Sequence, residues 1–254
     1  MPTPFYHLSL AQELIERPDL PPSFQEEVVS YRAEFLFGNI APDVQVVSGQ
    51  PRAETHFFDL PLRQNLLKPW ELLWKTYPQL TLSSNLKPQQ RAFLIGYLCH
   101  LLADWQWIRQ IFIPVFGLQS PWGTFQERLI WHNVLRAYLD QQIIPAMKPN
   151  LADYLLTVTS QSWLPFVADH HLLLWRDQIA RQLQPGQKIE TIEIFASRQN
   201  ISPDEFKRYL SSEDAMEEII FQRLPRTQLN LFRSQLIEDT LSFIKQLTNT
   251  ERIN

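Results

Sequence analysis

The sequence predicts an all-α protein, built as a single-domain bundle of many helices. Apolar residues recur at three- and four-residue spacing along most of the chain, and the only strand-like alternation is the brief stretch at 192–194. Proline, glycine and capping residues mark the helix ends, and counting them gives roughly eight helices. The 254 residues are 44% hydrophobic, enough for one large core, so we expect one domain over residues 1–254.

Charge and cysteine content exclude several classes of protein. The net charge is −4 with acidic and basic residues dispersed, so stable binding of duplex nucleic acid is not expected. No apolar run reaches the about 20 residues that a transmembrane helix needs. Cys99 is the single cysteine and cannot form an intrachain disulfide, and MPTPFYHLSL lacks the features of a signal peptide. We therefore expect a cytoplasmic protein, whose oligomeric state the sequence does not define.

The N-terminal part of the chain predicts two helices separated by a Pro-Pro break. Residues 7–16 carry an apolar stripe, and His7 stands at the start of that helix, where a histidine is commonly a cap or a half-buried surface residue. Residues 23–38 form a second helix that a Ser-x-x-Glu capping box opens and a glycine ends. The turn that follows, GNIAPD, is apolar up to Asp43, although Pro-Asp is also a common turn pair.

The next candidate residue is His56, in the segment RAETHFF. It is followed by two phenylalanines that must pack in the interior, so we expect the imidazole to be partly buried. A buried neutral imidazole is a good metal ligand. The region 61–88 then predicts only a short helix between loops.

The most apolar run of the chain is AFLIGYLCHLLAD, residues 92–104. It follows a Lys-Pro helix start and predicts a buried helix. Gly96, His100 and Asp104 recur every fourth residue and so share one stripe, where the glycine leaves room for another backbone or a ligand. A buried carboxylate requires a cation beside it, which could be an arginine, the histidine itself or a metal ion.

Further histidines lie in the second half of the chain. The helix after residue 104 is expected to break at Pro114 and Gly117. A capping box opens the next helix, 124–147, which holds His132 and, one turn later, Arg136. Asp169, His170 and His171 are adjacent in a later helix, where at most one histidine can face a given site because neighbours point about 100° apart. A capping box at 202–205 opens a further helix, and the C-terminal helix, about 227–247, carries an apolar stripe, so both are expected to be packing elements.

Taken in order, the segments FLFGNIAPD, R-x-x-THF and FLIGYLCHLLAD resemble the zinc-dependent phospholipase C family, whose relatives include the S1/P1 single-strand nucleases. The resemblance is strongest over residues 1–110 and implies an all-α bundle of the phospholipase C/P1 nuclease type. It also implies one to three Zn²⁺ ions at the bottom of a cleft.

The resemblance further implies which residues bind each metal ion. One ion would be held by Asp43, His56, His100 and Asp104, and another would share Asp104 and use His7 with the N-terminal groups of the chain. For the remaining ion, His132 matches one ligand. However, Arg136 stands where the family has a glutamate, and Gln110 stands near the place of a histidine.

The implied function is that of a metal-dependent phosphoric-ester hydrolase of the phospholipase C type, in which zinc-bound hydroxide attacks a phosphodiester. Asp43 would serve as ligand or as base toward the attacking water, and the substrate would be a phospholipid or another phosphodiester. One alternative is an S1/P1-like nuclease or a small-phosphoester phosphodiesterase. Another is a non-catalytic metal-binding scaffold with a degraded cluster, which Arg136 favours. Arg52 and Arg136 could contact phosphate, although structural salt bridges are the commoner role.

Overall fold

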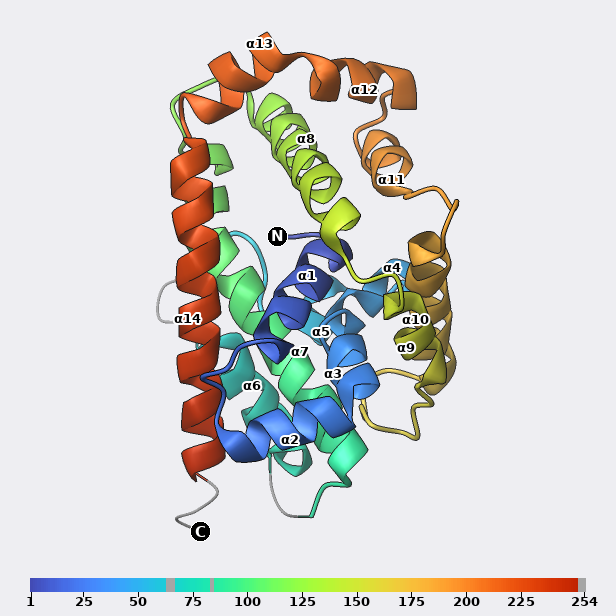
Figure 1. The fold of residues 1–254 in the computed structure, drawn as a ribbon. Helices are drawn as coiled ribbons and strands as arrows, with labels where there is room; N and C mark the ends of the chain where they lie inside the picture. The colour runs from blue at the N-terminus through green and yellow to red at the C-terminus, as the bar shows by residue number, and fades with distance from the viewer. Residues whose placement is uncertain (63–66, 83–84, 251–254) are drawn as a thin grey trace.

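The structure is a computed structural model that describes residues 1–62, 67–82 and 85–250. The predicted all-α class is confirmed, since these residues form fourteen α-helices and no strand (Figure 1). The α-helices are, in chain order, α1 (Pro4–Ile15), α2 (Pro22–Ser30), α3 (Arg32–Gly38), α4 (Gln45–Ser48), α5 (Arg52–His56), α6 (Pro69–Thr76), α7 (Pro88–Trp107), α8 (Phe125–Ile143), α9 (Leu151–Thr157), α10 (Asp169–Leu183), α11 (Thr191–Arg198), α12 (Pro203–Ser211), α13 (Glu213–Ala215) and α14 (Arg226–Thr250). The 3₁₀ segments are η1 (Ala41–Val44), η2 (Pro78–Leu80) and η4 (Ile144–Ala146), and the π-helical ones are η3 (Ile108–Phe116) and η5 (Met216–Phe221).

The prediction of roughly eight helices was wrong because several helices are shorter than two turns and show no periodicity. The stretch 23–38, predicted as one helix, is divided into α2 and α3 at Tyr31, whose φ and ψ are −120° and 41°. The capping box predicted there is also absent, since α2 begins at Pro22 without a side-chain cap. Of the break predicted at Pro114 and Gly117, the first part was wrong, because η3 continues through Pro114; the second is confirmed, because η3 ends at Phe116, directly before Gly117. By contrast, the cap at Thr124 is confirmed, with the Glu127 amide donating to its hydroxyl.

Helix α7 runs through the core and, from Ala92 to Trp105, is buried on all sides. It contacts α1, α2, α3, α6 and α14 (Figure 1). The contact with α3 is especially close: a Cβ at Gly96 would lie 2.2 Å from the carbonyl oxygen of Phe35, and a Cβ at Gly38 would lie 2.0 Å from that of Phe93. Two glycines therefore allow the backbones of α3 and α7 to touch, which fixes the turn after α3 beside α7.

The long helix α14 covers one side of the molecule, while α8, α11, α12 and α13 form the part beyond the N-terminal end of α1 (Figure 1). A buried carboxylate, Asp140 on α8, ties these parts together. It accepts hydrogen bonds from the hydroxyl of Thr3, which caps α1, and from the hydroxyl of Thr191 at 2.7 Å, at the start of α11. In the described residues, no helix is long and apolar enough to cross a membrane.

Burial raises the pKa of Asp140 from its ordinary 3.8 to about 6, although the two threonine hydroxyls and Arg136 oppose this rise. Between about pH 4 and pH 6 the folded state therefore binds more protons than the unfolded chain, and the free energy of unfolding falls as the pH rises. Asp140→Asn, which stays neutral, is expected to lack this fall. As the pH rises from 4 to 7, its free energy of unfolding should increase relative to that of the parent by up to about 3 kcal/mol, as measured by urea unfolding. Parallel pH profiles for the two proteins would contradict this expectation.

Candidate metal centre

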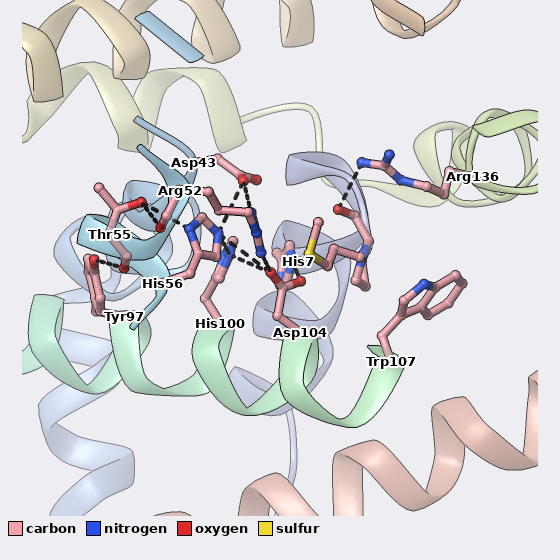
Figure 2. A network of polar contacts seen from close by, with 12 residues as sticks. His7, Asp43, Arg52, Thr55, His56, Tyr97, His100, Asp104, Trp107 and Arg136 are labelled. Carbon is pink, nitrogen blue, oxygen red and sulfur yellow. Dashed lines mark hydrogen bonds and ion pairs between the residues drawn. The ribbon is translucent and has the colours of Figure 1, made fainter. Parts of the chain in front are cut away.

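Five of the predicted site residues converge at one buried place (Figure 2). His7 comes from α1, Asp43 from η1, His56 from the last position of α5, and His100 and Asp104 from consecutive turns of α7. The histidines and Asp104 are at most 1% exposed, whereas the side chain of Asp43 is 14% exposed. His7, expected at the start of its helix, lies one turn inside α1 because the helix already begins at Pro4, and this position buries the imidazole.

The side chains form two overlapping groups whose candidate ligand atoms lie within 4.8 Å of one another. One group is His7, His100 and Asp104, and the other is Asp43, His56 and His100. Nε2 of His56 lies 3.4 Å from Oδ1 of Asp43 and 3.3 Å from Nε2 of His100. Nε2 of His7 lies 3.3 Å from Oδ1 of Asp104. His100 belongs to both groups, so it is the centre of the cluster.

Backbone and hydroxyl groups set the orientation of two imidazoles. Nδ1 of His100 donates to the carbonyl of Asn39 at 2.7 Å. The hydroxyl of Thr55 donates to the carbonyl of Arg52 at 3.3 Å and therefore accepts from Nδ1 of His56 at 2.9 Å. Since Nδ1 of each ring is engaged in these hydrogen bonds, Nε2 is the atom of each ring that could bind a metal ion. Such an arrangement is typical of imidazoles that bind a metal ion and are held by outer hydrogen bonds.

The buried cluster also leaves polar atoms without partners. Both ring nitrogens of His7 and Oδ1 of Asp104 make no hydrogen bond, and the His7 ring stacks on His100 with the centroids 3.7 Å apart. Burial lowers the pKa of His7 to about 4, and burial together with the Arg52 guanidinium lowers the pKa of His56 to about 3. Both imidazoles are therefore neutral at pH 7, so their lone pairs are available to a cation.

Of the three cations considered for Asp104, the structure places an arginine beside it. Arg52 forms an ion pair with Asp104 and lies 3.8 Å from Oδ1 of Asp43 (Figure 2). Burial alone would raise the pKa of Asp104, but the Arg52 guanidinium holds it well below its ordinary value. Arg52 neutralises one carboxylate oxygen, while the other still faces His7 without a hydrogen bond.

The residues expected at a third metal ion do not converge in the structure. His132 packs against Phe112 and accepts a hydrogen bond from the indole of Trp107 at 3.0 Å. The same His132 atom, Nε2, lies 3.5 Å from the Met1 amino group. Gln110 is exposed and donates to Gln106.

The three adjacent residues on α10 also lie outside both groups. Asp169 accepts hydrogen bonds from the hydroxyl of Ser160 and the amide of Ser162, which gives it a role in the loop before α10. The rings of His170 and His171 pack on each other, and His170 is exposed.

Sequence reasoning missed the groups that support the cluster. The carbonyl of Asn39 is a backbone atom, so no residue type signals its role. Thr55 precedes His56 directly, and a hydroxyl next to a candidate ligand is the one signal that could have identified it. Tyr97 donates to the carbonyl of Thr55 and thereby connects α7 with α5, a contact between residues far apart in the sequence.

The fold and this site define an all-α protein with a buried imidazole and carboxylate cluster suited to a divalent metal ion, and such nitrogen and oxygen donors are those that zinc accepts. Residues 6–107 match the family model described as zinc dependent phospholipase C, so this region is similar to the zinc-dependent phospholipase C family. All five residues of the cluster lie within the matched region, whereas His132 and Arg136 lie outside it. Comparison with curated proteins and with solved structures gave no match.

Proposed function

We propose that the protein is a zinc-dependent hydrolase of the phospholipase C type that cleaves the phosphodiester of a phospholipid. The observation that carries the proposal is the pair of imidazoles, His56 and His100, whose Nε2 atoms lie 3.3 Å apart, with Asp43 and Asp104 on either side. Two Nε2 atoms at this distance can both coordinate one metal ion. The match of residues 6–107 to the zinc-dependent phospholipase C family supports zinc as that metal ion and phosphodiester hydrolysis as the reaction.

The residues present fit zinc. Asp43, His56, His100 and Asp104 would hold one ion, and His7 would hold a second together with Asp104. His132 is left out of this set because its Nε2 already accepts the Trp107 indole hydrogen. When bound, zinc supplies a Lewis acid and lowers the pKa of a coordinated water toward neutrality.

A cavity adjoins the cluster, and Asp43 of the cluster and the neighbouring Arg52 line it. This cavity has a volume of about 340 Å³. Asp43 is partly exposed there, so we propose that it accepts the proton of the attacking water. The guanidinium of Arg52 is placed to hold a phosphate oxygen of the substrate.

In the proposed reaction the water oxygen bonds to phosphorus and the bond from phosphorus to the glycerol oxygen breaks. The glycerol oxygen leaves with a proton, so the products are a diacylglycerol and a phosphorylated headgroup. We also propose that this reaction takes place in the cytoplasm.

Removing the metal is expected to abolish turnover. The purified protein should contain at least one zinc ion per chain by elemental mass spectrometry. Dialysis against a chelator should stop hydrolysis of phospholipid in mixed micelles, and added zinc should restore it. Hydrolysis that continues at the original rate in metal-free protein would refute the proposal.

One observation favours a second candidate, a non-catalytic scaffold. Arg52 already neutralises Asp104, so the cluster has an internal cation that keeps the fold intact without a metal ion. For a scaffold, elemental analysis would find less than one ion per chain after reconstitution with zinc. Alternatively, it would find a bound ion with no hydrolysis of phospholipids or of bis(p-nitrophenyl) phosphate.

A further inference from the structure

The cavity beside the cluster is lined by residues from several parts of the chain. Asp43 and Arg52 connect it to the proposed metal centre, and the N-terminal residues 1–5 form part of its wall. The wall also includes Arg136 of α8 and Arg198 of α11. Figure 2 shows Arg136 extending from α8 toward the start of α1, where it donates to the carbonyl of Pro2 at 3.4 Å.

The charges lining this cavity do not balance. Three arginines face a single carboxylate, Asp43, and that carboxylate is already close to Arg52. Within the described parts of the chain, Arg136 and Arg198 form no ion pair. Two positive charges therefore remain available to a ligand in the cavity.

The groups that Arg136 contacts directly are neutral, and Asp140 on the same helix acts on it only through its charge. Its guanidinium lies over the ring of Phe195, 4.3 Å from the centroid, and donates to Oδ1 of Asn133 at 3.0 Å. Its Nε is buried and has no hydrogen-bond partner. Burial, followed by repulsion from Arg198, lowers the pKa of Arg136 to about 10, so it stays charged at pH 7. An anion between the two arginines would offset the cost of holding these charges together.

Resting on the proposed function, we propose that the cavity binds the phospholipid headgroup and that this headgroup carries a second anionic group, a carboxylate or a phosphate, held by Arg136 and Arg198. Guanidinium groups match both anions with paired hydrogen bonds. A cavity of about 340 Å³ suits a headgroup rather than acyl chains. A headgroup with a cationic end would meet like charge in the same place, which disfavours choline.

The test begins with binding, using two pairs of headgroup compounds that differ only in the anionic group. Phosphoserine is compared with phosphoethanolamine, and inositol 1,4-bisphosphate with inositol 1-phosphate, by isothermal titration of the purified protein. At least one pair should show about tenfold tighter binding of the compound with the extra anion, since hydrogen bonds to charged groups contribute this much. The pair that discriminates identifies the anion as carboxylate or phosphate.

Two variants and one control test whether the cavity arginines cause the preference for the extra anionic group. Arg136→Gln and Arg198→Gln should each reduce the preference to less than about threefold, and Arg198 is exposed, so its variant is expected to fold normally. Arg208→Gln removes one positive charge from exposed α12, outside the cavity, and should keep the full preference. Equal binding within both pairs would overturn the proposal, as would an unchanged preference in both cavity variants.

Hydrolysis separates this proposal from the proposed function. In micelles of constant charge, phosphatidylserine or phosphatidylinositol 4-phosphate should be cleaved about ten times faster than phosphatidylcholine, and Arg198→Gln should remove that ratio. Cleavage of all three at equal rates would overturn the headgroup proposal and leave the hydrolase intact. An arginine-dependent binding preference without any cleavage would support the headgroup site and refute the hydrolase.

Discussion

Replacing His100 with alanine is expected to weaken zinc binding by more than about 100-fold and to stop turnover. The loss should exceed the ~10–100-fold cost of removing an outer-sphere partner. The reason is that His100 is a proposed ligand of the first zinc ion and also lies beside His7 and Asp104, the proposed ligands of the second. Two measurements test this expectation. Elemental mass spectrometry after equilibrium dialysis gives the zinc content per chain, and an assay in mixed micelles gives the rate of phospholipid hydrolysis.

His170→Ala is the matched control for this variant. It removes an exposed imidazole on α10 that belongs to neither group, so zinc content and turnover should stay at the parent level. Circular dichroism of both variants separates loss of metal from loss of fold. If the His100 variant kept the zinc content of the parent, the cluster would not be the metal site.

Gly96→Ala is expected to destabilise the protein by about 3 kcal/mol, because a methyl group there would overlap backbone atoms. The added Cβ would lie 2.2 Å from the carbonyl oxygen of Phe35 and 3.0 Å from the amide of Asn39, and backbone cannot move aside as a flexible side chain can. The variant should also lower zinc affinity, since separating α3 from α7 moves the Asn39 carbonyl away from His100. Urea unfolding measures the first effect and equilibrium dialysis the second.

The control for this variant is Gln89→Ala, an exposed position in the first turn of the same helix. Its free energy of unfolding should change by less than about 0.5 kcal/mol. Equal stability of the Gly96 variant and the parent would show that α3 and α7 do not need their close contact.

Much of the cluster could be predicted because its residues stand in short segments of unusual composition. His100 and Asp104 are polar residues in the most apolar run of the chain, residues 92–104, and that contrast marks them as candidate site residues. Their partners His7, Asp43 and His56 come from three other elements, and only the order of the segments, compared with a known family, connected them. Their convergence is a tertiary property that periodicity does not encode.

The remaining features escaped prediction for physical reasons. The short helices α4 and α5 contain four and five residues, too few for an apolar stripe to repeat. Arg198 could not be predicted as a cavity residue, because a single arginine near a helix end is common. Its position is informative only together with Arg136, which lines the same cavity and is far away in the sequence. The division at Tyr31 depends on backbone angles that no sequence signal marks.

Helix α7 contributes to the site in three different ways over only nine residues. Gly96 sets the distance to α3, Tyr97 anchors α5, and His100 and Asp104 supply donor atoms. Inserting or deleting one residue within this span would turn everything beyond it by about 100° around the helix axis, which would separate the anchors from the donors. This stretch should therefore tolerate substitutions at selected positions but no change of length. In a series of one-residue insertions along the helix, folding and metal binding should be lost together.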